Sequence, residues 1–112
     1  MIEFYDFGKI TINGKRYTTD VIIFPDHVRD KWWRNQGHSL SIEDLREVVQ
    51  AKPEVLIIGT GYNGYMKVPD EVLEHFISTG TEVIVGKTRE ACKTYNRLAS
   101  TKRVVAAFHL AC

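Results

Sequence analysis

Residues 54–64 read Glu-Val-Leu-Ile-Ile-Gly-Thr-Gly-Tyr-Asn-Gly, an apolar, β-branched segment that ends abruptly in glycines. A strand that is apolar on both faces belongs in the middle of a sheet that helices cover. In such sheets, ligands usually bind at the loops that follow the carboxyl ends of the strands. The stretch therefore predicts a buried central strand from Val55 to Ile58, and it places a candidate functional site in the glycine loop.

The residues after this loop alternate between helical and extended patterns. Pro69 and Thr88 mark the starts of two helices, because proline suits a first helical position and threonine can cap a helix. Residues 82–86 repeat the pattern of an apolar strand that ends in glycine, and a last strand runs from residue 104 to about residue 110. Strands that alternate with helices imply right-handed crossovers and a largely parallel sheet.

The residues before the stretch predict antiparallel strands and one more helix. Asn13-Gly14 separates two short β segments, and this dipeptide favours the type I′ turn of a hairpin. Residues 21–24 extend the β-rich region, whereas residues 27–40 have no clear period and predict a long loop. Ser41 and Asp44 form a capping-box pattern, which predicts the start of a helix.

The composition is that of one ordinary globular domain. The chain has 112 residues, of which 44% are hydrophobic and 26% are charged, and both values lie near globular averages. We expect a single α/β domain over residues 1–112. Its architecture is a sandwich with a central mixed, partly parallel sheet, to which an N-terminal β-hairpin adds an antiparallel portion.

Charge and hydropathy limit the classes of partner. Fifteen basic residues against fourteen acidic ones give a net charge of +1, so the charge gives no reason to expect nucleic acid or anionic lipid as the partner. No apolar run approaches the ~20 residues of a membrane-spanning helix, and the first residues lack a signal-peptide pattern. We therefore expect a cytoplasmic protein without membrane insertion. Cys92 and Cys112 lie far apart and are expected to be reduced.

The glycine loop matches G-x-G-x-x-G, the fingerprint of dinucleotide-binding loops, but its context differs. In that fingerprint the glycines open a helix directly, whereas residues 65–68 separate this loop from Pro69. Two other interpretations stay open. The glycines can permit a tight loop with positive φ, or the Thr60 hydroxyl and the loop amides can line a pocket for a small anion or polar metabolite.

Topology places further polar residues beside this loop. Lys87 follows the second glycine-terminated strand, and His109 interrupts the end of the last apolar strand. The candidate ligand or partner rim comprises Thr60, Gly61, Tyr62, Lys87 and His109. His109 is either a hydrogen-bonded core residue or an acid/base group.

The sequence offers no complete catalytic or metal constellation. The four histidines are scattered, and none has a second histidine at the i, i+4 spacing of a helical metal site. Cys112 and His109 are three positions apart, which an extended strand converts to about 10 Å, so they do not form a nucleophile and base pair. We expect no metal, no cofactor and no catalytic residue.

The loop before the first helix is a candidate interface. Cations and aromatic residues alternate there, a combination that stacks bases, forms protein interfaces, or folds a tryptophan onto the core. With a net charge near zero, protein contact ranks above nucleic acid. The candidate interface residues are Trp32, Trp33, Arg34 and His38.

Several segments together resemble a known family of small domains, which includes the adipogenesis-associated domain protein and mitochondrial complex-I assembly factor three. The similar segments are Trp33-Arg34, Gly37-His38-Ser39, residues 53–61, Tyr95-Asn96 and Phe108-His109-Leu110-Ala111-Cys112. The resemblance implies a three-layer fold with a central mixed sheet and a further β element. It implies no reaction, since most members are uncharacterised and the mitochondrial member is an assembly factor.

Two functional hypotheses follow. The first is a non-catalytic binding or assembly module that contacts a protein partner through the rim. Residues 27–40, which we call the tryptophan loop, would lie nearby. The second is a small-molecule or anion-binding protein, or an enzyme, that uses the same rim with His109 or His38 as acid/base and Thr60 holding an anion. An exposed strand of the hairpin also leaves open weak pairing with a second copy of the chain.

Overall fold

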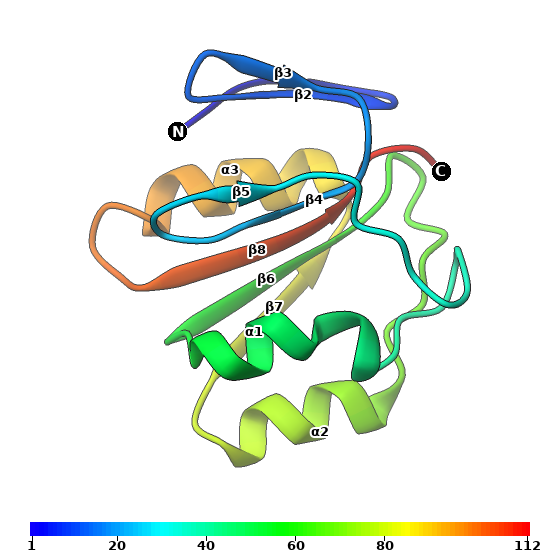
Figure 1. Ribbon diagram of the computed structural model, residues 1–112, viewed down its shortest axis with the longest axis vertical. Coiled ribbons are helices and arrows are strands. Elements are labelled where there is room, and N and C mark those ends of the chain that lie inside the picture. Colours follow the sequence, from blue (N-terminus) through cyan, green and yellow to red (C-terminus); the bar gives the residue numbers. More distant parts are fainter.

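Eight strands in two sheets and three α-helices make up the computed structural model, which describes residues 1–112 (Figure 1). The strands are β1 (Ile2–Asp6), β2 (Lys9–Ile12), β3 (Lys15–Tyr17), β4 (Val21–Ile23), β5 (Val28–Arg29), β6 (Val55–Thr60), β7 (Glu82–Gly86) and β8 (Val104–His109). The helices are a 3-10 turn, η1 (Glu43–Leu45), and α1 (Arg46–Ala51), α2 (Asp70–Ser78) and α3 (Thr88–Leu98). The expected α/β class is confirmed.

The central sheet has five strands in the order β5-β4-β8-β6-β7. Strand β6 pairs in parallel with both β7 and β8, while β4 runs antiparallel to β8. All six residues of β6 are buried, and the apolar run predicted this for the first four, Val55 to Ile58. The register aligns the carboxyl ends of β6 and β8, with Thr60 opposite His109. The loops after these two strands therefore emerge together at one end of the sheet, where the parallel strands have their carboxyl ends.

A second sheet of three antiparallel strands, β1-β2-β3, forms at the amino terminus. Asn13 and Gly14 both have positive φ, 49° and 80°, which confirms the predicted hairpin turn. The hairpin belongs to this separate sheet and adds no antiparallel portion to the central one. Sequence analysis also missed β1, in which a register shift between Ile2 and Phe4 interrupts the alternation of buried and exposed residues.

Two apolar cores lie on the two faces of the central sheet. Figure 1 shows α3 and the three-stranded sheet on one side, and α1 and α2 on the other. Val55 and Ile57 of β6 belong to the first core, whereas Leu56 and Ile58 belong to the second. Because successive strand residues face opposite sides, a strand between two cores must be apolar throughout.

The helix starts differ in detail from the predictions. The capping box is present, since the Ser41 amide donates to Asp44 Oδ2 at 2.9 Å, but the first turn is the 3-10 turn η1. Pro69 is the residue before α2 rather than its first residue. Thr88 is the first residue of α3 and caps nothing, because its hydroxyl bonds elsewhere.

The predicted loop over residues 27–40 contains a short strand. Val28 and Arg29 pair with Ile23 and Ile22, so β5 is the edge of the central sheet. None of the helices is of a length and apolarity that would span a lipid bilayer.

Candidate functional site

The predicted rim forms where β6 and β8 end. Thr60 is buried there, and its hydroxyl donates to the Gly86 carbonyl at 3.2 Å. This hydroxyl is therefore used within the fold, and Thr60 does not present it at the surface. Lys87 lies at the same end of the sheet, where its aliphatic chain passes over Gly64.

Thr88 joins three segments at this end of the sheet. Its fully buried hydroxyl donates to the His109 carbonyl at 2.6 Å and accepts the Gly61 amide at 2.9 Å. Gly61 has a φ of +110°, and a Cβ at this position would lie 2.4 Å from the carbonyl carbon of Cys112. The positive φ and the close approach both require glycine here.

The carboxyl-terminal segment lies across the glycine loop, as Figure 1 also shows. The Tyr62 amide donates to the Ala111 carbonyl at 2.7 Å, and the amides of Asn63 and Tyr65 donate to the Cys112 carbonyl at 3.2 and 3.1 Å. These loop amides, with that of Gly61, were candidates for holding a small anion. In the structure they bind the chain itself, and the loop is fixed rather than open.

A buried polar cluster lies on the other side of His109. Asp20 Oδ2 accepts from Arg34 Nη2 at 2.7 Å and from His109 Nδ1 at 2.8 Å. Asp20 Oδ1 accepts the Leu110 amide at 2.7 Å. Arg34 also donates through Nε and Nη2 to the Gly37 carbonyl. The cluster ties the tryptophan loop to the end of β8.

Hydrogen bonding determines the charge state of Asp20. Burial acts to raise the pKa of its carboxyl, but the hydrogen bonds from His109, the Leu110 amide and Arg34 outweigh burial and lower the pKa. An ionised Asp20 accepts a hydrogen bond from Nδ1–H of His109, and in the tautomer that carries this hydrogen Nε2 is an acceptor. His109 Nε2 and Arg34 Nη1 are buried and have no hydrogen-bond partner.

His38 and Tyr65 lie over this cluster. The His38 ring stands edge to face with the His109 ring, with centroids 5.7 Å apart, and with the Tyr65 ring at 6.3 Å. Arg34, His38 and His109 were predicted in two separate candidate groups, and the structure brings them together. Asp20 was not predicted, because only the pairing of β4 with β8 places the residue before β4 beside His109.

The two tryptophans have different environments. Trp32 is 1% exposed, its Nε1 donates to the Asp44 carbonyl at 3.0 Å, and the Arg34 guanidinium lies 4.8 Å from its ring centroid. Trp33 is 70% exposed. Trp32 is therefore a core residue, and Trp33 is the tryptophan at the surface.

An aromatic patch covers the outside of the glycine loop. We define it as Phe7, Tyr62 and Arg89. The rings of Phe7 and Tyr62 meet edge to face with centroids 5.7 Å apart, and the Arg89 guanidinium lies 5.4 Å from the Tyr62 ring. Phe7 and Tyr62 are 49% and 39% exposed. Only Tyr62 of the patch was a predicted site residue; Phe7 comes from the β1–β2 turn and Arg89 from the start of α3.

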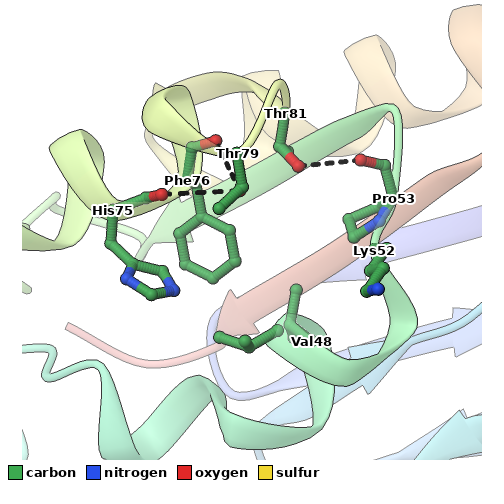
Figure 2. A pocket seen from close by; sticks show the side chains of 8 residues that line it. Val48, Lys52, Pro53, His75, Phe76, Thr79 and Thr81 are labelled. Atoms are coloured by element: carbon green, nitrogen blue, oxygen red, sulfur yellow. Dashed lines mark hydrogen bonds between the residues drawn. The ribbon is translucent and has the colours of Figure 1, made fainter.

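A cavity of about 380 Å³ opens between α1 and α2, near the amino ends of β6 and β7. Figure 2 shows His75 and Phe76 side by side on α2, with Val48 of α1 across the cavity. The hydroxyls of Thr79 and Thr81 donate to the carbonyls of Phe76 and Pro53. None of the predicted site residues lines this cavity.

The family comparison decides where the chain belongs. A model of the family described as "Protein of unknown function (DUF498/DUF598)" matches residues 2–110. The chain is a member of this family. The match covers both sheets, the aromatic patch and the buried polar cluster.

Two relatives of this DUF498/DUF598 chain carry the name NADH dehydrogenase (ubiquinone) 1 alpha subcomplex assembly factor 3. The protein from Danio rerio is 35% identical over 110 residues, which are 96% of this chain and 62% of the relative. The protein from Xenopus tropicalis is 27% identical over 108 residues, which are 95% of this chain and 58% of the relative. The resemblance found from the sequence motifs is confirmed, and the chain spans about three fifths of these relatives.

A solved structure shares the whole DUF498/DUF598 fold. It is a conserved hypothetical protein, PH1505, from Pyrococcus horikoshii OT3, with 28% sequence identity and a TM-score of 0.86. The match covers 100% of this chain and 99% of that one. The two-sheet architecture is therefore an arrangement that an experimentally solved protein also has.

Proposed function

We propose that this chain is a non-catalytic protein-binding module that acts in the assembly of a protein complex, and that it holds its partner through the aromatic patch. The observation that carries the proposal is the exposure of Phe7 and Tyr62 side by side, with the Arg89 guanidinium against the Tyr62 ring. The names of the two assembly-factor relatives support the same class of function.

The composition of the patch favours protein binding. Tyrosine and arginine are enriched among the residues that contribute most binding energy at protein interfaces. An exposed phenylalanine beside them adds apolar area that a partner can remove from water, at about 25 cal/mol per Å². Arg89 also lies 3.8 Å from Asp6, both half exposed, so its charge is only weakly neutralised.

The rigidity of the patch supports the proposal as well. The Tyr62 amide is bonded to the Ala111 carbonyl, and the preceding Gly61 is held by Thr88. A loop that is already fixed loses little conformational entropy when a partner binds. The patch therefore presents its side chains on a preorganised base.

The test compares variants of the patch with a matched surface control. Phe7→Ala and Tyr62→Ala remove the proposed contacts, whereas Ile77→Ala truncates a side chain that is 61% exposed on α2, outside the patch. Each tagged protein is purified from its native cells, and the co-purifying proteins are quantified by mass spectrometry. We expect one protein that the wild type and Ile77→Ala capture and that both patch variants lose at least tenfold.

Equal capture by the patch variants and the control would overturn the proposal. The comparison requires that all three variants keep the melting temperature of the wild type. We expect this result, because each substituted side chain is exposed. A cytoplasmic location and the absence of nucleic-acid binding stay predictions of the sequence. Weak self-association also stays a prediction, and recovery of an untagged copy of the chain in the same experiment would support it.

A further inference from the structure

The buried cluster of Asp20, Arg34 and His109 contains two polar atoms that the fold leaves unused. The Arg34 side chain is 5% exposed and that of His109 is 9% exposed, yet Arg34 Nη1 and His109 Nε2 have no hydrogen-bond partner. Native proteins pair nearly all buried polar groups, because an unpaired one costs about 1–3 kcal/mol. These two atoms therefore need an explanation.

Contacts within the fold account for three of the five side-chain nitrogens of Arg34 and His109. Arg34 Nε and Nη2 bind the Gly37 carbonyl and Asp20, and His109 Nδ1 binds Asp20. These bonds already join the tryptophan loop to β8. Arg34 Nη1 and His109 Nε2 take no part in this connection, so the connection does not explain them.

We propose that Arg34 Nη1 and His109 Nε2 bind one oxyanion group, a carboxylate or a phosphate. Arg34 Nη1 carries two N–H donors, and guanidinium groups match the paired oxygens of such groups. His109 Nε2 takes up a proton from the acid form of the ligand or from the buffer and keeps it, and the Nε2–H donates a hydrogen bond to a ligand oxygen. The ring charge gained in this way balances the ligand, because Asp20 already neutralises Arg34.

His38 is the exposed aromatic neighbour of His109. Its side chain is exposed, while its ring stands against that of His109 at 5.7 Å. Exposed side chains change rotamer on the picosecond to nanosecond timescale, so the His38 ring moves away from the His109 ring without movement of the backbone. We therefore expect His38→Ala to keep the site and to ease access to it.

The experiment observes the histidine ring nitrogens of the purified wild type by ¹⁵N NMR. Sodium phosphate and sodium acetate are titrated separately, with sodium chloride keeping the ionic strength constant. The expected result is a saturable change of the His109 nitrogens in the millimolar range, with a protonated Nε2 in the bound state. His27, an exposed histidine that lies beyond the opposite end of β4 from Asp20, is the internal control.

Two arms distinguish the sources of the oxyanion. If phosphate or acetate changes the signals of the His109 nitrogens, a free small anion is the ligand. If these anions have no effect and an acidic peptide with an amidated carboxyl terminus does change the signals, the ligand is a carboxylate that a partner protein presents. No change of the His109 nitrogens with any of the three probes overturns the proposal.

A pair of variants removes the remaining ambiguity. Arg34→Lys keeps the charge and loses the forked donors, and Arg97→Lys makes the same change on the exposed surface of α3. We expect at least a tenfold loss of affinity for Arg34→Lys, and wild-type affinity for Arg97→Lys and for His38→Ala. Equal affinity of both lysine variants would contradict the role of Arg34. The probes need neither the partner nor the aromatic patch, so this proposal and the proposed function fail independently.

Discussion

Arg34 and His109, which lie 75 positions apart in the sequence, donate to the same oxygen of Asp20. Their donor nitrogens approach to 3.1 Å around that shared acceptor. The first belongs to the tryptophan loop and the second ends the strand β8. One carboxylate therefore fixes the position of a long loop relative to the central sheet.

Asp20→Asn should destabilise the fold by roughly 2–4 kcal/mol at neutral pH, because it removes the charge that balances buried Arg34. The pKa of Asp20 is lowered from its usual 3.8. The stabilisation is therefore complete above the unfolded value and is lost as the pH falls through the lower folded pKa. Urea unfolding of both proteins between about pH 7 and pH 2 should show a difference that narrows only below about pH 4.

Asp26→Asn is the control for this experiment. Asp26 also has a lowered pKa, caused first by its hydrogen bond with His27, but both side chains are exposed. Its unfolding curves should stay close to those of the wild type. If the difference in the free energy of unfolding between the wild type and Asp20→Asn does not depend on pH, the role of ionised Asp20 as the partner of Arg34 is contradicted.

Thr88→Val should lower the free energy of unfolding by about 1–3 kcal/mol, because it leaves the Gly61 amide and the His109 carbonyl without their partner. Thr94→Val on the same helix removes a hydroxyl that bonds only the Glu90 carbonyl near the surface. Its cost should be within about 0.5 kcal/mol. Chemical denaturation measures both, and equal effects would show that the Thr88 junction is unimportant.

Gly61→Ala should cost more than Gly80→Ala. Both glycines have positive φ, +110° and +89°, so an alanine is strained at either position. Only at Gly61 does the new Cβ meet backbone, that of Cys112, while nothing lies within 4 Å at Gly80. We expect a difference of at least about 1 kcal/mol in the free energy of unfolding, and similar values would mean that the carboxyl-terminal segment moves away freely.

Trp32→Phe should destabilise the protein by about 1–3 kcal/mol, because it removes the bond to the Asp44 carbonyl from a buried site. Trp33→Phe should change stability by less than about 0.5 kcal/mol. Fluorescence offers a second measurement, since the variant that keeps only Trp32 should emit at shorter wavelength than the variant that keeps only Trp33. The reverse order of emission would contradict the placement of the two rings.

Short stretches of sequence predicted two kinds of element correctly: strands that are buried along their whole length, and turns that need particular residues. The apolar run of β6 and the Asn13-Gly14 turn are examples, since each signal lies within a few neighbouring residues. Strand β1 was missed because its register shift breaks the alternation. The role of Thr88 was mistaken because a threonine before a helical pattern usually caps, and only the nearby ends of β6 and β8 give its hydroxyl other partners.

The site depends on contacts between distant segments, which a single sequence does not reveal. His109 was predicted as a candidate because it interrupts an apolar strand. Asp20 carries no such signal, since an acidic residue after a hairpin is ordinary. Phe7 and Arg89 join Tyr62 only through the packing of the amino-terminal sheet beside α3.

Photo-crosslinking at position 62 tests the central claim, that the aromatic patch holds a protein partner. Tyr62 is replaced by p-benzoylphenylalanine in the full chain, Ile77 is replaced in the same way as control, and both proteins are irradiated in their native cells. We expect a discrete crosslinked protein from position 62 that position 77 does not give. No adduct at position 62, or the same adducts at both positions, would contradict it.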